Sequence, residues 1–302
     1  MAPGVNDSTP AKISRMLGAC WKLITGSQEA GRNLTVFDDD VFLVSYPRSG
    51  NTWTRFLIGN LLDPNDPVSF RNIESRIPEI YFNPDHVMRR LARPRILKSH
   101  ECFQPRYPSI IYIVRDPRDV CVSNYHHNLK AGNLADGYPM EDFVPRFLRV
   151  EFDRQFGSWA DNVRSWLAMR EGQPGFLLLR YEDMKQNPAR ELAKVANFLS
   201  QRSFPNLLAT PEHLRRAIAL STPERMRELE SQQSRDWVLT KKTRRDKPFV
   251  RSAVAGSWIT ALSPTAVSLL ESELRPLMKK LGYELSGRER ESSDTIPATA
   301  TE

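Results

Sequence analysis

A short run of apolar residues leads directly into a polar loop that contains a single glycine. The run, VFLVSY at 41–46, lies between three aspartates at 38–40 and Pro47. Continuous apolarity over this length, without alternation, is typical of a buried parallel strand. After the loop, Trp53, Phe56 and Leu57 follow at helical spacing in the segment 50–62. The sequence therefore predicts a strand, a loop and a helix in immediate succession.

Similar apolar runs recur at 95–98, 110–114 and 176–181, and helical segments follow two of them. Asp116-Pro117 and Asn187-Pro188 place a helix-capping side chain directly before a proline at the first helical position. Strands that alternate with helices indicate a parallel, doubly wound sheet. The predicted fold class is α/β, a single-domain, P-loop-like parallel sheet flanked by helices.

The 302 residues are predicted to form an N-terminal arm at 1–36 with a short helix around 12–24, a domain at 37–285, and a polar, disordered tail at 286–302. The N-terminus lacks the long apolar core of a signal peptide. The longest uncharged stretch, 252–270, contains glycine, proline and many hydroxyl residues, so no membrane span is expected. A cytoplasmic location is the expectation.

Lysine and arginine outnumber aspartate and glutamate by 43 to 36, which gives a net charge of +7 and favours anionic ligands. No nucleic-acid-binding signature accompanies this charge, so no nucleic acid partner is expected. The three cysteines form neither a disulfide framework nor a metal-binding cluster, and no metal is expected. The densest basic cluster lies at 241–247.

The loop SYPRSGNT at 45–52 resembles a phosphate-binding P-loop in part. Compared with G-x-x-x-x-G-K-[ST], Gly50 and Thr52 are in place, Ser45 replaces the first glycine and Asn51 replaces the lysine. Free N–H groups at the start of a helix bind anions, and Arg48 and Ser49 add donors. Without the lysine, chemistry on Mg-ATP is disfavoured. The alternative is an ordinary turn between strand and helix.

Four motifs, in order along the chain, resemble the sulfotransferases that use 3′-phosphoadenosine 5′-phosphosulfate (PAPS). YPRSGNTW at 46–53 is similar to their 5′-phosphosulfate loop, and the segment 113–126 to their 3′-phosphate motif. RYEDMK at 180–185 and the segment 249–258 resemble two further motifs of that family. The soluble, cytosolic-type members are the most similar in pattern.

The resemblance implies a set of nucleotide-binding positions. Arg115, Ser123 and Arg251 would bind the 3′-phosphate, Trp53 would stack on adenine, and Tyr181 would contact the same base. The complete set is Arg48, Ser49, Gly50, Asn51, Thr52, Trp53, Arg115, Ser123, Tyr181 and Arg251. For Arg115 a salt bridge to a nearby aspartate, and for Trp53 simple core packing, are the structural alternatives.

Lys98-Ser99-His100 follows a predicted strand and resembles the catalytic segment of the family. In an extended chain Lys98 and His100 point the same way. The resemblance implies His100 as general base, with Lys98 and Arg48 meeting the charge that develops on the leaving phosphate. A structural histidine is the alternative for His100, and His126 and His127 are interpreted as helix-surface or packing residues.

The implied reaction is transfer of the sulfonate group from PAPS to a hydroxyl or amine of a small acceptor, without a metal. A P-loop nucleotide kinase or NTPase, a carbohydrate sulfotransferase and a non-catalytic nucleotide-binding scaffold are the alternatives. A homodimer stays open, since no clear match to the family's C-terminal dimer motif is visible.

Three positions depart from the family pattern: Arg48 replaces a lysine, Ser252-Ala253 replaces Lys-Gly, and Pro223 stands where phenylalanine is common. The basic cluster at 241–247 could partly replace the lost charge, or be a solvated surface run. The acceptor pocket is expected from 71–89 and 129–152. Its candidate lining, or alternatively core, residues are Phe70, Tyr81, Phe82, Phe143 and Phe147.

Overall fold

The computed structural model describes residues 29–207 and 209–286, which form one α/β unit built on a parallel sheet. The strands are β1 (Val41–Ser45), β2 (Ile96–Ser99), β3 (Ser109–Val114) and β4 (Phe176–Arg180), in the order β2-β1-β3-β4. All neighbours run parallel, and Val41 of β1 is paired with Ile96 and with Ser109. The predicted fold class is confirmed.

The predicted boundaries are correct to within one residue at the carboxyl ends of two strands, β2 and β4. The strand predicted at 95–98 runs from Ile96 to Ser99. The strand predicted at 176–181 ends at Arg180, because Tyr181 already begins the next helix, α8 (Tyr181–Gln186). The first helix, α2 (Asn51–Leu62), begins one residue after Gly50, which is the left-handed residue that precedes it.

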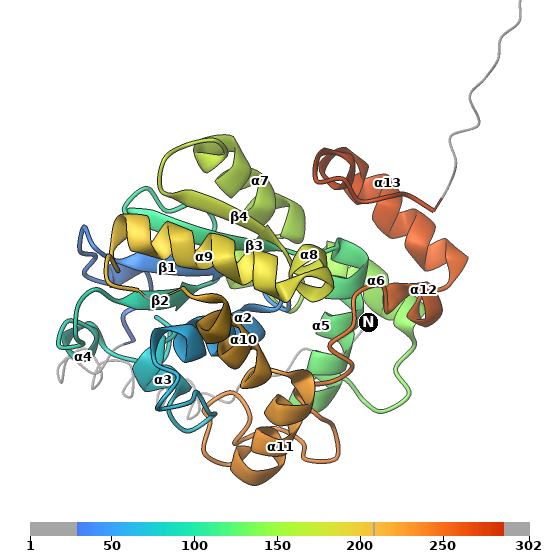
Figure 1. Cartoon of the computed structure of the whole chain (residues 1–302). Helices are drawn as coiled ribbons and strands as arrows, with labels where there is room; N and C mark the ends of the chain where they lie inside the picture. Colours follow the sequence, from blue (N-terminus) through green and yellow to red (C-terminus); the bar gives the residue numbers. More distant parts are fainter. Residues whose placement is uncertain (1–28, 208, 287–302) are drawn as a thin grey trace, which may run out of the picture.

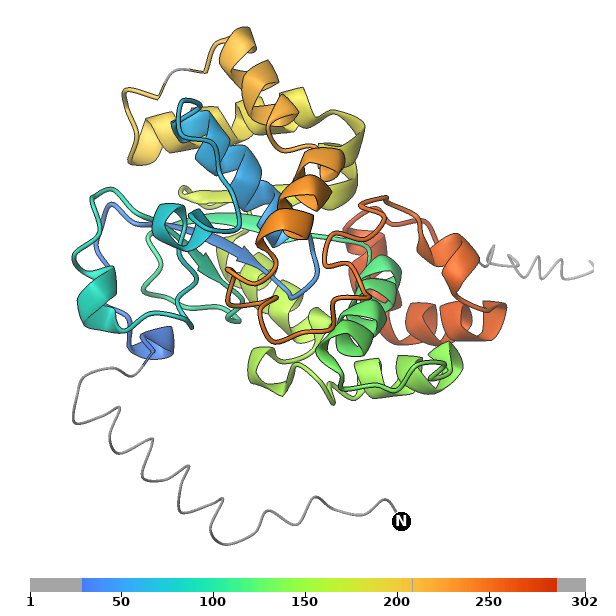
Figure 2. The same ribbon diagram turned by 90° about the horizontal axis from the view of Figure 1, so that it is seen from below.

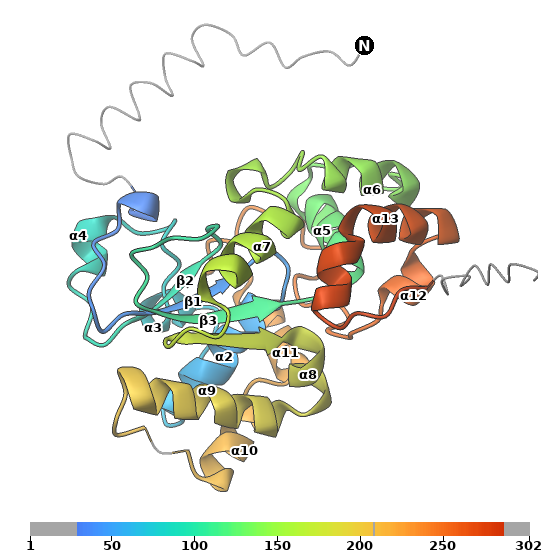
Figure 3. The same ribbon diagram turned by 90° about the horizontal axis from the view of Figure 1, so that it is seen from above.

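The sheet separates two apolar cores, as the continuous apolarity of β1 requires. Phe42 and Val44 belong to one core, whereas Val41 and Leu43 belong to the other. Figure 3 shows α2, α8, α9 (Pro188–Arg202) and α10 (Pro211–Ala219) on one face of the sheet. The opposite face is covered by α5 (Pro117–Ala131), α6 (Met140–Leu148), α7 (Trp159–Arg170) and α13 (Pro264–Lys280).

The remaining elements lie outside these two layers. They are η1 (Gly31–Asn33), α3 (Ile73–Arg76), α4 (Asp85–Met88), η2 (Arg154–Phe156), α11 (Pro223–Gln233) and α12 (Trp258–Ala261). Figure 1 labels α3, α4, α11 and α12 among them. A third apolar cluster, with Phe56, Phe70 and Trp237, packs beneath α11. Residues 234–257 contain neither helix nor strand, and in Figure 2 this segment passes from α11 back toward α5.

The two predicted capping sites begin α5 and α9. The side chain of Asp116 accepts from the N–H of Arg118, and that of Asn187 accepts from the N–H of Arg190, with proline at the first position of each helix. Both caps satisfy backbone donors that a helix start leaves open. Because Asp116 follows β3 after a single residue, its cap fixes where α5 leaves the sheet.

Within the described residues, no helix is both long enough and apolar enough to span a bilayer. The uncharged stretch 252–270 forms α12 and the first part of α13 instead. The helix predicted around 12–24 and nearly all of the predicted tail lie outside the described residues. Ser286, the last described residue, donates its N–H to Glu271 Oε1 at 3.0 Å.

Candidate functional site

A cleft of about 350 Å³ opens where the loop after β1, the end of β2 and the start of α5 meet. The segment 249–253 closes one side of it. Most of the sequence-predicted site residues line this cleft: Arg48, Gly50, Asn51, Thr52, Trp53, Lys98, His100, Arg115, Ser123, Tyr181 and Arg251. Ser49 is the one predicted site residue outside the lining, and its side chain is fully buried.

The loop between β1 and α2 has a backbone that only glycine fits well at position 50. Gly50 has φ +97°, and a Cβ there would lie 2.5 Å from Cδ2 of Tyr181. Positive φ carries little cost for glycine and a substantial one for other residues. Arg48 also has a positive φ of 69°. This conformation brings the loop backbone against the Tyr181 ring at the start of α2.

Three buried polar atoms near this loop lack a hydrogen-bond partner in the described structure, namely Ser49 Oγ, Asn51 Oδ1 and Arg115 Nε. Buried polar groups in native proteins are nearly always paired, so orphans beside a helix start indicate a polar ligand. The side-chain amide of Asn51 donates to Ser45 Oγ at 3.1 Å and to Leu43 O at 3.4 Å. The residue in the lysine position of the P-loop pattern therefore ties the helix start to β1.

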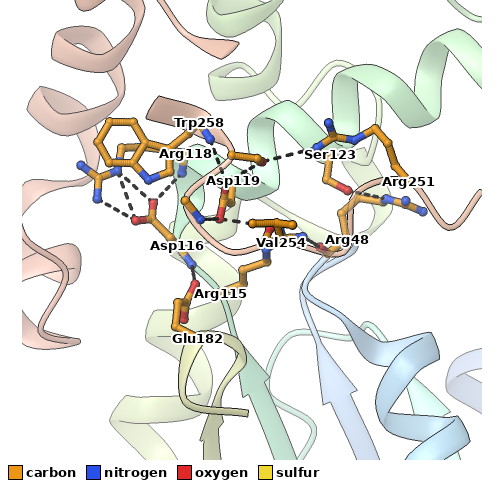
Figure 4. A network of polar contacts seen from close by, with 12 residues as sticks. Arg48, Arg115, Asp116, Arg118, Asp119, Ser123, Glu182, Arg251, Val254 and Trp258 are labelled. Atoms are coloured by element: carbon orange, nitrogen blue, oxygen red, sulfur yellow. Dashed lines mark hydrogen bonds and ion pairs between the residues drawn. The ribbon is translucent and has the colours of Figure 1, made fainter. Parts of the chain in front are cut away.

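Three arginines converge on one side of the cleft (Figure 4). Arg48 Nε donates to Ser123 Oγ at 3.3 Å, and Arg115 Nη1 donates to the carbonyl of Arg48 at 3.2 Å. Burial, then the neighbouring charges of Arg115 and Arg251, lower the pKa of Arg48 to about 10. Mutual repulsion of this kind is relieved when an anion binds between the groups.

Asp119 of α5 positions the segment that carries Arg251. Its carboxylate accepts from the N–H of Gly256 at 2.7 Å, the hydroxyl of Ser257 at 2.8 Å and the N–H of Trp258 at 3.0 Å (Figure 4). It also lies 3.6 Å from Arg115 Nη2, so the salt bridge considered for Arg115 exists beside its place in the cleft. Nothing in the sequence around Asp119 pointed to a contact with a segment more than a hundred residues away.

Trp53 and Tyr181 form an aromatic wall of the cleft. Their rings meet edge to face with centroids 5.8 Å apart, and Lys185 Nζ lies 4.9 Å from the Trp53 ring. Trp53 Nε1 donates to the carbonyl of Ser221 at 2.9 Å, which fixes the indole. Pro223, where the family pattern often has an aromatic, lines the cleft as well. The wall can therefore present aromatic faces to a planar ligand.

His100 is buried at the end of β2 with a defined tautomer. Its Nδ1 lies 2.7 Å from the carbonyl oxygen of Ser45. A carbonyl only accepts, so neutral His100 carries its proton on Nδ1 and keeps a lone pair on Nε2. Burial, and then the charge of Lys98, hold the pKa of His100 well below its usual value of 6.5. His100 is thus unprotonated at neutral pH.

Several residues that line the cleft were not singled out as site residues from the sequence. His127, interpreted as a helix-surface or packing residue, lines the cleft, with Nδ1 3.5 Å from Arg48 Nη1. Burial and Arg48 lower its pKa to about 3. Its position one helical turn after Ser123 could have revealed this. Glu79 and Asp153 also line the cleft, and no motif pointed to them.

The aromatic residues left open as pocket or core divide between the two. Tyr81 and Phe82 line the cleft, together with Phe156, whereas Phe70, Phe143 and Phe147 are buried core. The ring of Phe156 lies 5.3 Å from that of His100 and 5.3 Å from that of Tyr81. The end of the cleft beside His100 is therefore largely aromatic.

The basic cluster at 241–247 does not line the cleft. Arg244 pairs with Asp136 and Asp246, and Lys247 pairs with Asp136. Lys130 Nζ donates to the carbonyls of Arg244 and Lys247 at 2.9 and 2.6 Å, so the segment is fastened to α5.

Among the residues that the structure covers, no group of three or more histidine, cysteine or acidic side chains could hold a metal ion.

Comparison with known proteins agrees with this architecture. A family model described as "Sulfotransferase domain" matches residues 38–282. Sulfotransferase 2B1 of Mus musculus is 36% identical over 177 residues, a match covering 55% of this chain and 51% of the relative. The human sulfotransferase 2B1 is 33% identical over 181 residues, a match covering 55% of this chain and 47% of the relative. The chain spans about half the length of these curated relatives.

Two solved structures have a similar fold. Mouse sulfotransferase SULT7A1 complexed with PAP aligns with a TM-score of 0.65 at 23% identity, covering 84% of this chain and 91% of the other. Retinol dehydratase in complex with androsterone and the inactive cofactor PAP aligns with a TM-score of 0.66 at 19% identity, covering 89% of this chain and 87% of the other. At these identities the similarity establishes the fold alone. Since the family match extends over most of the described residues, this chain belongs to the sulfotransferase domain family.

Proposed function

We propose that the chain transfers a sulfonate group from PAPS to a hydroxyl or amine of a small acceptor. The observation that carries the proposal is that one cleft contains both an arginine-rich anion site and a buried, neutral histidine with a free Nε2. The structural relatives that bind PAP support a nucleotide of this type, since PAP is what remains of PAPS after the sulfonate leaves.

The nucleotide would lie between the loop after β1 and the segment 249–258. The 5′-phosphosulfate would meet the N–H groups of the loop with Arg48, Ser49, Gly50, Asn51 and Thr52. Arg115, Ser123 and Arg251 would bind the 3′-phosphate, for which guanidinium forks are well suited. Trp53 and Tyr181 would contact the adenine. The unpartnered Ser49 Oγ and Arg115 Nε supply donors for these phosphates.

His100 would act as the general base. As the acceptor oxygen or nitrogen attacks sulfur, its proton passes to Nε2 of His100 while the bond from sulfur to the bridging oxygen of the 5′-phosphate breaks. The electron pair of that bond stays on the phosphate, where Arg48 and Lys98 would stabilise it. The cationic side chains supply the positive charge, so we expect turnover to survive chelation of metals.

The acceptor would lie beside His100, Tyr81, Phe82 and Phe156, which favours an acceptor with an apolar or aromatic body. A kinase reaction is less well supported, because Asn51 stands in the lysine position and is bonded to β1. A carbohydrate-type sulfotransferase with a carboxylate base is the second candidate, since Glu79 lies in the same cleft.

The test is a screen of phenols, alcohols, amines and sugars with sulfur-labelled PAPS, in EDTA, with labelled ATP plus Mg²⁺ as the alternative donor. The proposal expects label on a small hydroxyl or amine acceptor from PAPS and none from ATP. Transfer of phosphate from ATP would establish the kinase alternative. Absence of label from every acceptor class would contradict the proposed activity.

A further inference from the structure

A buried ion pair between Glu79 and Lys98 lies in the wall of the cleft. Lys98 Nζ is 2.5 Å from Glu79 Oε2, and the two side chains are only 4% and 6% exposed. Both residues line the same cleft as His100. Lys98, which the proposed reaction uses, is therefore held by the carboxylate of Glu79, which has no role in the proposed transfer of the sulfonate group.

The backbone sets this pair. Glu79 forms an isolated parallel bridge with Lys98 at the edge of β2. The N–H of Lys98 donates to the carbonyl of Pro78 at 2.8 Å, and the N–H of Ile80 donates to that of Lys98 at 3.2 Å. Residues directly opposite in neighbouring strands project to the same side. Glu79 is thus placed beside Lys98 by strand pairing and not by chance approach of two long side chains.

The backbone of Glu79 is held by a further ion pair, between Glu74 and Arg55. The N–H of Glu79 donates to Glu74 Oε2 at 2.9 Å, and Glu74 Oε1 accepts from Arg55 Nη2 at 2.8 Å. Arg55 is itself fully buried in α2. The arrangement Arg55–Glu74–Glu79–Lys98 therefore runs from the core of the protein to the cleft, with charges alternating except between the two glutamates.

We propose that Glu79 is a positioning residue that keeps Lys98 cationic and directed at the site of sulfonate transfer. The inference rests on the proposed function, because it assigns Lys98 a task there. An ammonium group can stabilise the leaving phosphate only while it is protonated. Burying it without a partner would favour its neutral form.

The surrounding charges fit this role. Burial lowers the pKa of Lys98, Arg55 lowers it further, and Glu79 and then Glu74 oppose these effects. The other titratable groups that face Lys98 are His100 and His127, both neutral at physiological pH. Glu79 is thus the principal group that keeps Lys98 charged. Without it, Lys98 would release its proton at a lower pH.

The test compares Glu79→Gln, which removes the charge at nearly constant shape, with Glu79→Asp, which keeps it. Glu191→Gln is the matched control, because Glu191 pairs with Lys194 on α9, away from the cleft. Two readouts are taken across pH. One is the rate of reductive methylation of Lys98, followed by peptide mass spectrometry, and the other is kcat for the acceptor found with PAPS.

We expect Glu79→Gln to move the methylation profile of Lys98 and the alkaline fall of kcat to lower pH together. The expected displacement is about 1–3 pH units, the usual effect of an adjacent opposite charge. In Glu79→Asp the methylation profile and the kcat profile should stay close to those of the wild type. In Glu191→Gln neither profile should change. The methylation readout needs no turnover, so a failure of the proposed function leaves this part of the test intact.

Unchanged methylation and kcat profiles in a folded Glu79→Gln variant would overturn the inference. Loss of turnover with an altered acid limb and an unchanged Lys98 profile would overturn it too, since Glu79 would then be acting as the base. Should Glu79→Gln fail to fold, Glu79→Ala takes its place as the variant without the charge. An unchanged methylation profile of Lys98 in Glu79→Ala would contradict the role.

Discussion

His100 donates its Nδ1 proton to the carbonyl oxygen of Ser45, across 2.7 Å, and so links the end of β2 to the end of β1. Ser45 is the last residue of β1, the strand that leads into the loop at 46–50. The residue proposed as base and the loop proposed to hold the donor are therefore fixed on each other by one hydrogen bond.

Replacing His100 should abolish proton removal and leave nucleotide binding near wild type. His100→Ala and His100→Asn are compared, because the Asn amide can still donate to Ser45. Both should reduce turnover about 10²–10⁴-fold, the usual worth of a positioned base. The defect should shrink for substituted phenols that are already ionised at the assay pH. If the asparagine variant turned over normally, His100 would serve structure alone.

Arg115→Ala should weaken binding of adenosine 3′,5′-bisphosphate about ten- to hundredfold, since a charged hydrogen bond contributes about 1.5–3 kcal/mol. The affinity for adenosine 5′-monophosphate, which lacks the 3′-phosphate, should fall much less in the same variant. Arg115 also donates to the carbonyl of Val254 at 3.1 Å, so the second ligand separates loss of phosphate contact from displacement of the segment. Equal losses for both nucleotides, measured by calorimetry, would assign Arg115 to structure.

Gly50→Ala should destabilise the fold and weaken nucleotide binding. The new Cβ would meet Tyr181 at 2.5 Å, and φ +97° is strained for alanine. Backbone strain of this kind costs about 1–3 kcal/mol. Gly132→Ala is the control, since Gly132 also has a positive φ, +78°, but nothing within 4 Å of its Cβ position. Chemical denaturation should give a larger loss for Gly50→Ala, and equal losses would refute the close approach to Tyr181.

Acid should destabilise the protein below pH 6.5. Burial lowers the pKa of three histidines: that of His100, that of His126 to about 4 and that of His127 to about 3. The unfolded chain therefore binds protons there that the folded chain does not. The free energy of unfolding should fall between pH 6.5 and 5.5 by about 1 kcal/mol for each of these three groups. The raised pKa of the Asp153 carboxyl acts in the opposite sense, at lower pH. His127→Gln should remove about a third of this pH dependence, and an unchanged dependence would contradict the lowered pKa of His127.

Much of the fold could be predicted from the sequence because its signals are local. The apolar run of β1, the cap at Asp116 and the proline that follows it each depend on adjacent residues. Two predicted strand ends differ from the observed ones by one residue. At Tyr181 the reason is that an aromatic side chain suits either the last strand position or the first turn of a helix.

The site itself was predictable only where a motif carries it. The contacts of Asp119 with the segment 256–258, and of Glu79 with Lys98, join residues that are distant in sequence or lie on an irregular edge. No periodicity indicates such pairs. The place of His127 beside the cleft was not predicted, because a histidine on a helix gives no sign of which face meets a cleft, although Ser123 one turn earlier shares that face.

The most direct measurement of the central claim is calorimetric titration of the EDTA-treated protein with adenosine 3′,5′-bisphosphate, beside ATP with Mg²⁺. Arg48, Arg115 and Arg251 line the cleft, and Arg115 Nε is a buried donor without a partner in the described structure. The account predicts a dissociation constant at or below the order of 10 µM, about 7 kcal/mol of binding free energy, for the bisphosphate without metal, and much weaker binding of ATP. Undetectable binding of the bisphosphate at millimolar concentration would contradict the account.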